Sequence, residues 1–187
     1  ADNIDRAIKK VTGELPGVEY HELQYEGYGP GGIGIIVEVT TDNKNRAASE
    51  VRSTFSKYGG NLAQPGALQH FFTKQGQFLI EAGKTDEESL MELALENGGE
   101  DVLNNGDHFE VRCDITEFDN LSSAFDKAGI QPDSAELAQI PGNLTPVGDE
   151  ETVRKLMRLT NALEELDDVQ NVYDNSDIDD ALLAKVE

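Results

Sequence analysis

The sequence is short of cysteine, basic residues and long apolar runs, and each shortage excludes a class of protein. Its 187 residues include a single cysteine, Cys113, which cannot form an internal disulfide or a multi-thiolate zinc or iron–sulfur site. Sparse cysteine favours a reducing compartment. The longest strongly apolar stretch, 33–39, is interrupted by Gly34 and Glu38 and is far too short to cross a bilayer. The sequence therefore predicts neither a membrane span nor a membrane partner.

Basic residues are outnumbered more than two to one. The chain has 15 Lys and Arg against 37 Asp and Glu, for a formal net charge of -22. A surface of this sign does not suit a polyphosphate partner, because neutralising phosphates needs cations. The imbalance is uneven, since residues 1–60 carry seven basic and nine acidic residues and the rest of the chain carries nearly all of the excess acid.

With 37% hydrophobic and 28% charged residues, the chain can bury a core, and its length fits two small domains or one domain interrupted by another. It begins at Ala1 without a signal pattern, so we expect a trimmed chain or a fragment. Apolar spacing in residues 2–11 predicts a helix.

The middle of the chain has the most regular pattern. Residues 74–146 read as a βαββαβ unit, the ferredoxin-like pattern, with a capping box of Thr85 and Glu88. The expected elements are strand 77–82, helix 86–97, strands 101–104 and 108–114, helix 117–128 and strand 136–140.

The flanking segments each lack part of such a unit. The first has strands 19–28 and 33–41, helix 43–58 capped by Asp42, and a strand over 68–73. The second has helix 149–166, strand 169–173 and an acidic tail over 174–180. Joining them predicts an α+β fold in which a domain of residues 18–73 and 147–187 is interrupted by an inserted domain, 74–146.

Two motifs resemble nucleotide-binding loops without their context. Residues 27–32 match G-x-G-x-x-G, but a strand follows where a dinucleotide site needs a helix. They are read as a glycine turn or, alternatively, as a surface of backbone amides for a large partner. Gly83-Lys84-Thr85 lacks the first glycine of a phosphate-binding loop, where Phe78 stands instead, so Thr85 is read as a helix cap.

No residue pattern predicts catalysis or a metal. His21, His70 and His108 lack ligand spacing, and the acidic residues after 174 lack the central glycine of a calcium loop. Cys113 lies in a strand pattern and is read as a small core residue. We predict no catalytic residue, no metal and no cofactor.

The helix expected over 43–58 is unusually basic for this chain. It presents Lys44, Arg46, Arg52 and Lys57 with a single acid, Glu50. These cations either balance neighbouring carboxylates or, together with the turn over residues 25–32, form a face that contacts RNA or the ribosome.

A long run of residues resembles one known family. Tyr25-Glu26-Gly27-Tyr28-Gly29-Pro30-Gly31-Gly32, residues 41–52 (TDNKNRAASEVR) and residues 55–62 (FSKYGGNL) resemble the YebC family. That family includes bacterial proteins labelled probable transcriptional regulators and the mitochondrial translational activator of cytochrome oxidase subunit I. The resemblance implies three domains, the third inserted in the second, with residues 1–17 the C-terminal end of a helical, basic N-terminal domain.

The resemblance also implies a function without catalysis. We expect a non-enzymatic regulator of gene expression that acts as a ribosome-associated translation factor, with ribosomal RNA, transfer RNA or the ribosome as partner. The alternative is a transcriptional regulator that binds promoter DNA. We expect a monomer in the cytoplasm, or in the mitochondrial matrix for an organellar member. The expected contact residues are Tyr25, Glu26, Gly27, Tyr28, Gly29, Pro30, Gly31, Gly32, Lys44, Asn45, Arg46, Arg52 and Lys57.

Overall fold

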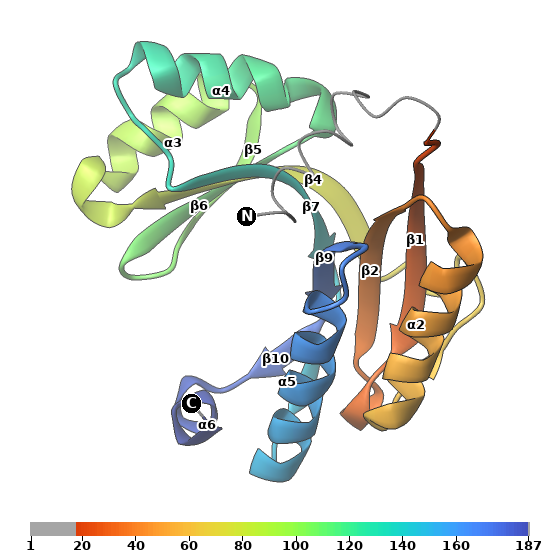
Figure 1. Cartoon of the computed structure of the whole chain (residues 1–187). Coiled ribbons are helices and arrows are strands. Elements are labelled where there is room, and N and C mark those ends of the chain that lie inside the picture. Colours follow the sequence, from red (N-terminus) through yellow and green to blue (C-terminus); the bar gives the residue numbers. More distant parts are fainter. Residues whose placement is uncertain (1–17, 187) are drawn as a thin grey trace. The chain divides into compact units, whose positions relative to one another are not determined.

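The computed structural model describes residues 18–186 and has the expected α+β fold, with antiparallel sheets and packed helices (Figure 1). The helix expected over 2–11 and the domain end expected over 1–17 lie outside the described residues. The described residues form two compact units: one joins residues 18–71 with residues 141–186, and the other is Phe72–Ile140. The boundaries expected from the sequence, after residues 73 and 146, lie a few residues later.

In the first unit, a four-stranded sheet has the order β3-β1-β2-β9. β1 is antiparallel to both β2 and β3, and β2 is antiparallel to β9. A separate pair, β8 and β10, is parallel. The elements are β1 His21–Tyr28, the 3-10 turn η1 Pro30–Gly32, β2 Gly34–Thr41, α2 Lys44–Lys57, β3 Asn61–Leu62, β8 Thr145–Val147, α5 Glu150–Glu164, β9 Val169–Asp174, β10 Ser176–Ile178 and α6 Asp180–Val186.

The core of the first unit lies between this sheet and two helices, α2 and α5 (Figure 1). Alternate residues of β2 point into it, as a strand's two-residue period requires. The helices contribute residues three and four apart. The buried set is Ile33, Ile35, Val37 and Val39 from β2 and the turn before it, Ala47, Val51 and Phe55 from α2, Val147 from β8, and Val153, Leu156, Leu159 and Leu163 from α5. The helices therefore lie side by side, with their outer faces in solvent.

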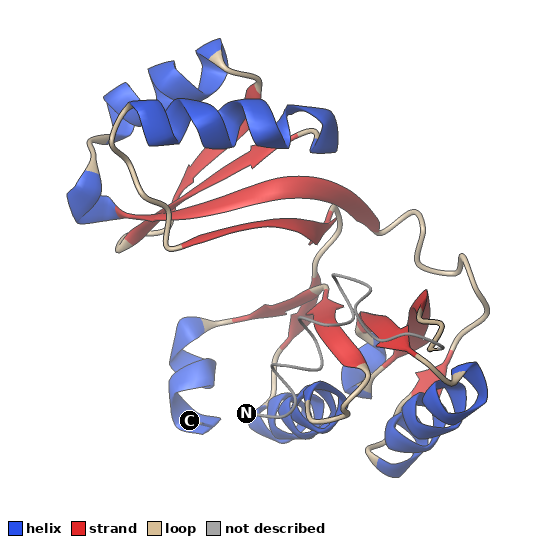
Figure 2. Cartoon of the chain, turned by 45° about the horizontal axis from the view of Figure 1, so that its top comes forward, coloured by secondary structure: helices blue, strands red, loops and turns tan. Residues whose placement is uncertain are grey.

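The second unit has the expected βαββαβ order. Its sheet runs β5-β6-β4-β7, with β6 antiparallel to both of its neighbours and both helices on one face (Figure 2). Its elements are β4 Phe72–Glu81, the 3-10 turn η2 Ala82–Lys84, α3 Glu87–Glu96, β5 Gly99–Asn104, β6 His108–Cys113, the 3-10 turn η3 Ile115–Glu117, α4 Phe118–Lys127 and β7 Ser134–Pro141.

Both units use the same crossover. In the second unit α3 joins β4 to β5, and β6 lies between these two strands. In the first unit α2 joins β2 to β3, and β1 lies between them. A split βαβ crossover is therefore present in each unit.

Two sequence-based elements are wrong. Residues 65–71 form turns rather than the strand expected over 68–73, because Leu68 is buried against Gly34 instead of joining a sheet. Residues 174–180 are not a solvated tail: residues 176–178 pair with β8. Asn175, 4% exposed, fixes this segment by accepting a hydrogen bond from the Gly34 N–H at 2.9 Å.

Two helix caps also differ from the prediction. Asn43, not Asp42, caps α2 by accepting a hydrogen bond from the Arg46 N–H. Asp86 caps α3 through the Ser89 N–H, in place of the expected capping box of Thr85 and Glu88. In both cases two neighbouring residues can act as caps, and the chain geometry selects the second one. Among residues 18–186, no helix is long and apolar enough to cross a membrane.

Candidate nucleic-acid interface

The helix α2 presents its basic side chains on a firmly held element. Its Asn43 cap and its buried stripe of Ala47, Val51 and Phe55 fix its ends and its rotation on the sheet. The predicted contact residues on it, Lys44, Asn45, Arg46, Arg52 and Lys57, are all exposed.

Arg46 is occupied by the fold. Its Nη2 lies 2.7 Å from the Asp42 Oδ1 and 3.0 Å from the Asp168 Oδ2. Asp168, only 6% exposed, also accepts a hydrogen bond from the Thr41 hydroxyl at 3.0 Å. The hydrogen bond to Asp42, followed by that to Asp168, raises the pKa of the guanidinium above its already high value. Of the two interpretations of the α2 cations, the first therefore holds for Arg46: its charge balances neighbouring carboxylates.

The other cations of α2 are not used in this way. Among the residues that the structure describes, Lys44, Arg52 and Lys57 form no ion pair. The Lys57 ammonium lies 5.5 Å from the centre of the Tyr58 ring, which is cation–π distance. These three charges are available to a partner.

The predicted face is divided between the two flanks of α2. Arg52 lines a hollow of about 440 Å³ beside β1 and the segment after β3, and Tyr25 lines the same hollow. Burial raises the pKa of the Tyr25 hydroxyl, so the group stays neutral at ordinary pH. Arg46 and Lys57 lie toward α5 instead. The hollow is lined by Gln24, Tyr25, Glu26, Arg52, Ser56, Asn61, Leu62, Ala63, Gln64 and Pro65.

The glycine turn has a packing role at most of its positions. A Cβ on Gly27 would lie 2.6 Å from the Phe55 ring of α2, and one on Gly29 would lie 2.8 Å from Ile35. Because neither glycine has a Cβ, the helix and the turn can approach the end of β1 closely. Gly31 and Gly32 have positive φ angles of 81° and 75° and lie exposed.

The remaining predicted positions of this segment fall into two groups. Tyr28, at 38% exposed, is accessible, whereas Glu26 is 6% exposed. The Glu26 carboxylate accepts a hydrogen bond from the Gly66 N–H, and its backbone carbonyl accepts one from the Ala63 N–H at 2.7 Å. Glu26 thus holds the segment that forms one wall of the hollow beside Tyr25. Pro30 is partly exposed in the turn η1.

Sequence reasoning missed a second basic element, α5. Its exposed Arg154, Lys155 and Arg158 lie in a stretch, 152–163, that contains no acid. Arg154 pairs with Glu150 at 2.5 Å and Lys155 with Glu151 at 3.1 Å, whereas Arg158 has no ion pair among the described residues. Together α2 and α5 carry seven of the 15 basic residues but four of the 37 acidic ones. That acid-free stretch was the available signal.

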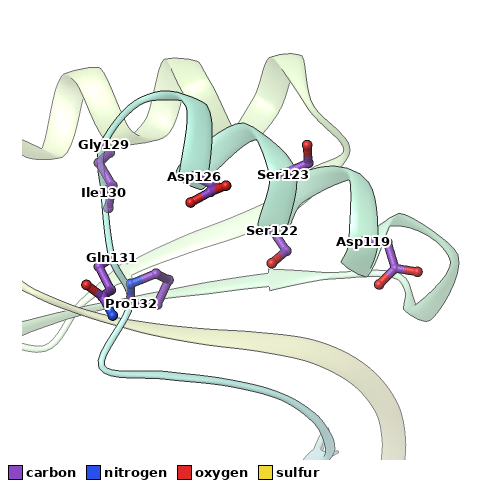
Figure 3. A pocket seen from close by; sticks show the side chains of 8 residues that line it. All are labelled: Asp119, Ser122, Ser123, Asp126, Gly129, Ile130, Gln131 and Pro132. Atoms are coloured by element: carbon purple, nitrogen blue, oxygen red, sulfur yellow. The ribbon is translucent and has the colours of Figure 1, made fainter.

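The second unit offers a hollow of a different character. It has a volume of about 680 Å³ and lies between α4 and the segment after it (Figure 3). Its lining includes the carboxylates of Asp119 and Asp126 and the hydroxyls of Ser122 and Ser123, without a Lys or Arg. A lining of this charge repels a phosphate backbone.

The histidines and the cysteine do not form a site together. His108 lies 3.2 Å from both Asp107 and Asp133 in the second unit. Cys113 is fully buried in the core of that unit, as expected, and burial raises the pKa of its thiol. Within residues 18–186, no three His, Cys, Asp or Glu side chains are placed to hold a metal ion.

Comparison with known proteins places these features in a family. The model of the TACO1/YebC second and third domain matches residues 20–176. A protein of Opitutus terrae named "Probable transcriptional regulatory protein" is 52% identical over 183 residues, covering 98% of this chain and 74% of its own length. A protein of the same name from Syntrophobacter fumaroxidans is 46% identical, covering 99% of this chain and 74% of its own length.

A solved structure agrees with the fold. The crystal structure of a conserved hypothetical protein from Aquifex aeolicus matches with a TM-score of 0.83 and 41% sequence identity, covering 96% of this chain and 74% of that one. A family match across most of the chain, relatives near half identical and a close structural likeness all point the same way: the chain belongs to the TACO1/YebC family.

Proposed function

We propose that this protein is a non-enzymatic regulator of gene expression that binds RNA through the helix layer of its first unit, as a ribosome-associated translation factor. The observation that carries the proposal is the gathering of basic side chains on α2 and α5 in a chain of net charge -22. The bacterial relatives are named probable transcriptional regulatory proteins, and these names support a role in gene regulation.

The fold favours RNA over duplex DNA. Helix-turn-helix proteins place two consecutive helices together, one of them in the major groove. In residues 18–186, each of α2, α3, α4 and α5 is followed by a strand, so no such pair exists there. The hollow beside Arg52 instead combines the aromatic Tyr25 with the side-chain amides of Asn61 and Gln64. An aromatic ring and amides suit an unpaired base, which stacks and hydrogen-bonds by its edges.

The second candidate function is a transcriptional regulator that binds DNA. The names of the relatives favour it. Such a regulator would bind duplex phosphates with the same cations. It would recognise the base sequence through a part of the protein other than a recognition helix of the described residues.

The test reverses two unpaired charges of α2. K44E/R52E changes exposed side chains that have no ion pair to lose, and Arg46 is left in place because it holds the buried Asp168. The matched control, K127E/K185E, makes the same change in net charge at exposed positions of α4 and α6. We expect the unchanged protein and the control to sediment with bacterial ribosomes and K44E/R52E to remain largely in the supernatant. Full sedimentation of a correctly folded K44E/R52E would refute the proposal.

A further inference from the structure

The last turn of α2 and the middle of α5 enclose a small basic hollow. It has a volume of about 280 Å³ and is lined by Lys57, Tyr58, Gly59, Lys155 and Arg158. Three of the five lining residues are cations, and no acidic residue lines the hollow. The hollow is therefore basic, although the chain as a whole carries a net charge of -22.

Two of these three charges are unpaired among the described residues. Lys57 contacts only the face of the Tyr58 ring, and Arg158 has no ion pair. Lys155 pairs with Glu151 at 3.1 Å, but the two side chains are 55% and 78% exposed, so the pair is weak and exchangeable. Binding an anion in this hollow would therefore disrupt few interactions within the protein.

Rigid elements hold the cations in place. Lys155 and Arg158 alternate along α5 with Leu156 and Leu159, which are buried in the core. At the end of α2, a Cβ on Gly60 would lie 2.5 Å from the Tyr28 carbonyl oxygen, so the chain passes there in close contact with β1. The spacing of the three cations is therefore set by the core rather than by mobile loops.

A simpler explanation covers only one of the three. A lysine in the last turn of a helix interacts favourably with the helix dipole, and this accounts for Lys57. It does not account for Lys155 and Arg158, which lie in the middle of α5. The pair with Glu151 gives Lys155 a partner within its own helix, whereas Arg158 lines the hollow without an ion pair among the described residues.

We propose that Lys57, Lys155 and Arg158 form a subsite for a backbone phosphodiester of a nucleic-acid strand, within the contact surface that α2 and α5 share. This inference rests on the proposed function, because it names the group that the helix layer takes up. The guanidinium supplies a planar pair of donors to two phosphate oxygens, and the ammonium groups supply point charges. Such contacts fix the position of a strand and carry no sequence preference.

The test measures binding against salt concentration. The probes are a fluorescent single-stranded RNA of about 12 nucleotides and a DNA of the same sequence. Each phosphate contact on a single strand contributes about 0.7 to the slope of log K against log salt. Because the subsite takes one phosphodiester, K57Q/R158Q should lower that slope by about 0.7. It should weaken binding equally across sequences. The control K127Q/K185Q removes the same charge elsewhere and should keep the slope.

The outcomes separate this inference from the proposed function. An equal loss with RNA and DNA supports a phosphodiester subsite common to both, and a loss with RNA alone assigns it to an RNA strand. An unchanged slope in K57Q/R158Q, with the unchanged protein binding normally, overturns the subsite alone. A loss in K57Q/R158Q with unaltered binding by K44E/R52E supports the subsite and contradicts the proposed role of Lys44 and Arg52. Absence of binding by the unchanged protein overturns both.

Discussion

At the residue scale, the glycines around the turn decide how closely the helix layer meets the sheet. Gly27 and Gly60 are backbone positions where a side chain has no room, since each would place a Cβ under 3 Å from neighbouring atoms. Gly27 belongs to a motif, residues 27–32, that looks like a nucleotide-binding loop, yet its physical role is close packing. This packing positions Arg52 and Lys57 on either flank of α2.

Gly27→Ala is expected to destabilise the first unit. The new methyl group would lie 2.6 Å from the Phe55 ring and 2.8 Å from the Asn61 carbonyl oxygen, and such overpacking costs about 1–3 kcal/mol. Urea unfolding followed by circular dichroism measures the cost. Gly148→Ala is the control, because nothing lies within 4 Å of its Cβ. Equal stability of the two variants would contradict this account of the turn.

His108 gives the second unit a predictable dependence on pH. The hydrogen bond to Asp107, with Asp133 nearby, raises the pKa of the imidazole above its ordinary value. A raised pKa in the folded state stabilises the fold fully below about pH 6.5, and this contribution is lost as the pH rises through the folded-state value. The unfolding free energy of the protein should therefore exceed that of His108→Gln by more at about pH 5.5 than at about pH 8.5. A constant or opposite difference would show that the imidazolium does not stabilise the unit.

At the element scale, apolar spacing predicted most helices and strands but not their partners. The stripe of Ala47, Val51 and Phe55 was enough to place α2 to within a residue at each end. The pairing of Arg46 with Asp168 was beyond reach, because it joins residues 122 apart through the fold. The predicted contact residues accordingly included an arginine that the fold uses, while the basic α5 was overlooked because its three cations follow two glutamates.

Arg46→Glu should lower stability more than Lys44→Glu, although both exchange an exposed cation of the same turn for an acid. Arg46→Glu places a carboxylate beside the buried Asp168 and Asp42, whereas Lys44 has no ion pair among the described residues. Removing one partner of a buried charge leaves the other uncompensated. Melting temperatures of the two variants, measured side by side, give the comparison. If the Lys44→Glu variant melted at as low a temperature as Arg46→Glu, the ion pair between Arg46 and Asp168 would not stabilise the fold.

At the scale of the whole molecule, charge is separated rather than balanced. The helix layer of the first unit is basic, and the remainder of the chain holds most of the acid. In the proposed function, a nucleic-acid strand would be attracted to the former and repelled by the latter, which would restrict it to one face of that unit. Composition alone pointed away from nucleic acid, because it averages over this separation.

The central claim is that the protein acts on RNA, and crosslinking in living cells tests it most directly. Growing cells that produce the tagged protein are irradiated with ultraviolet light, and the nucleic acid attached to it is sequenced. The account predicts ribosomal and transfer RNA, greatly reduced in K44E/R52E and retained in K127E/K185E. Recovery of defined promoter DNA without RNA would contradict it and would establish the transcriptional alternative.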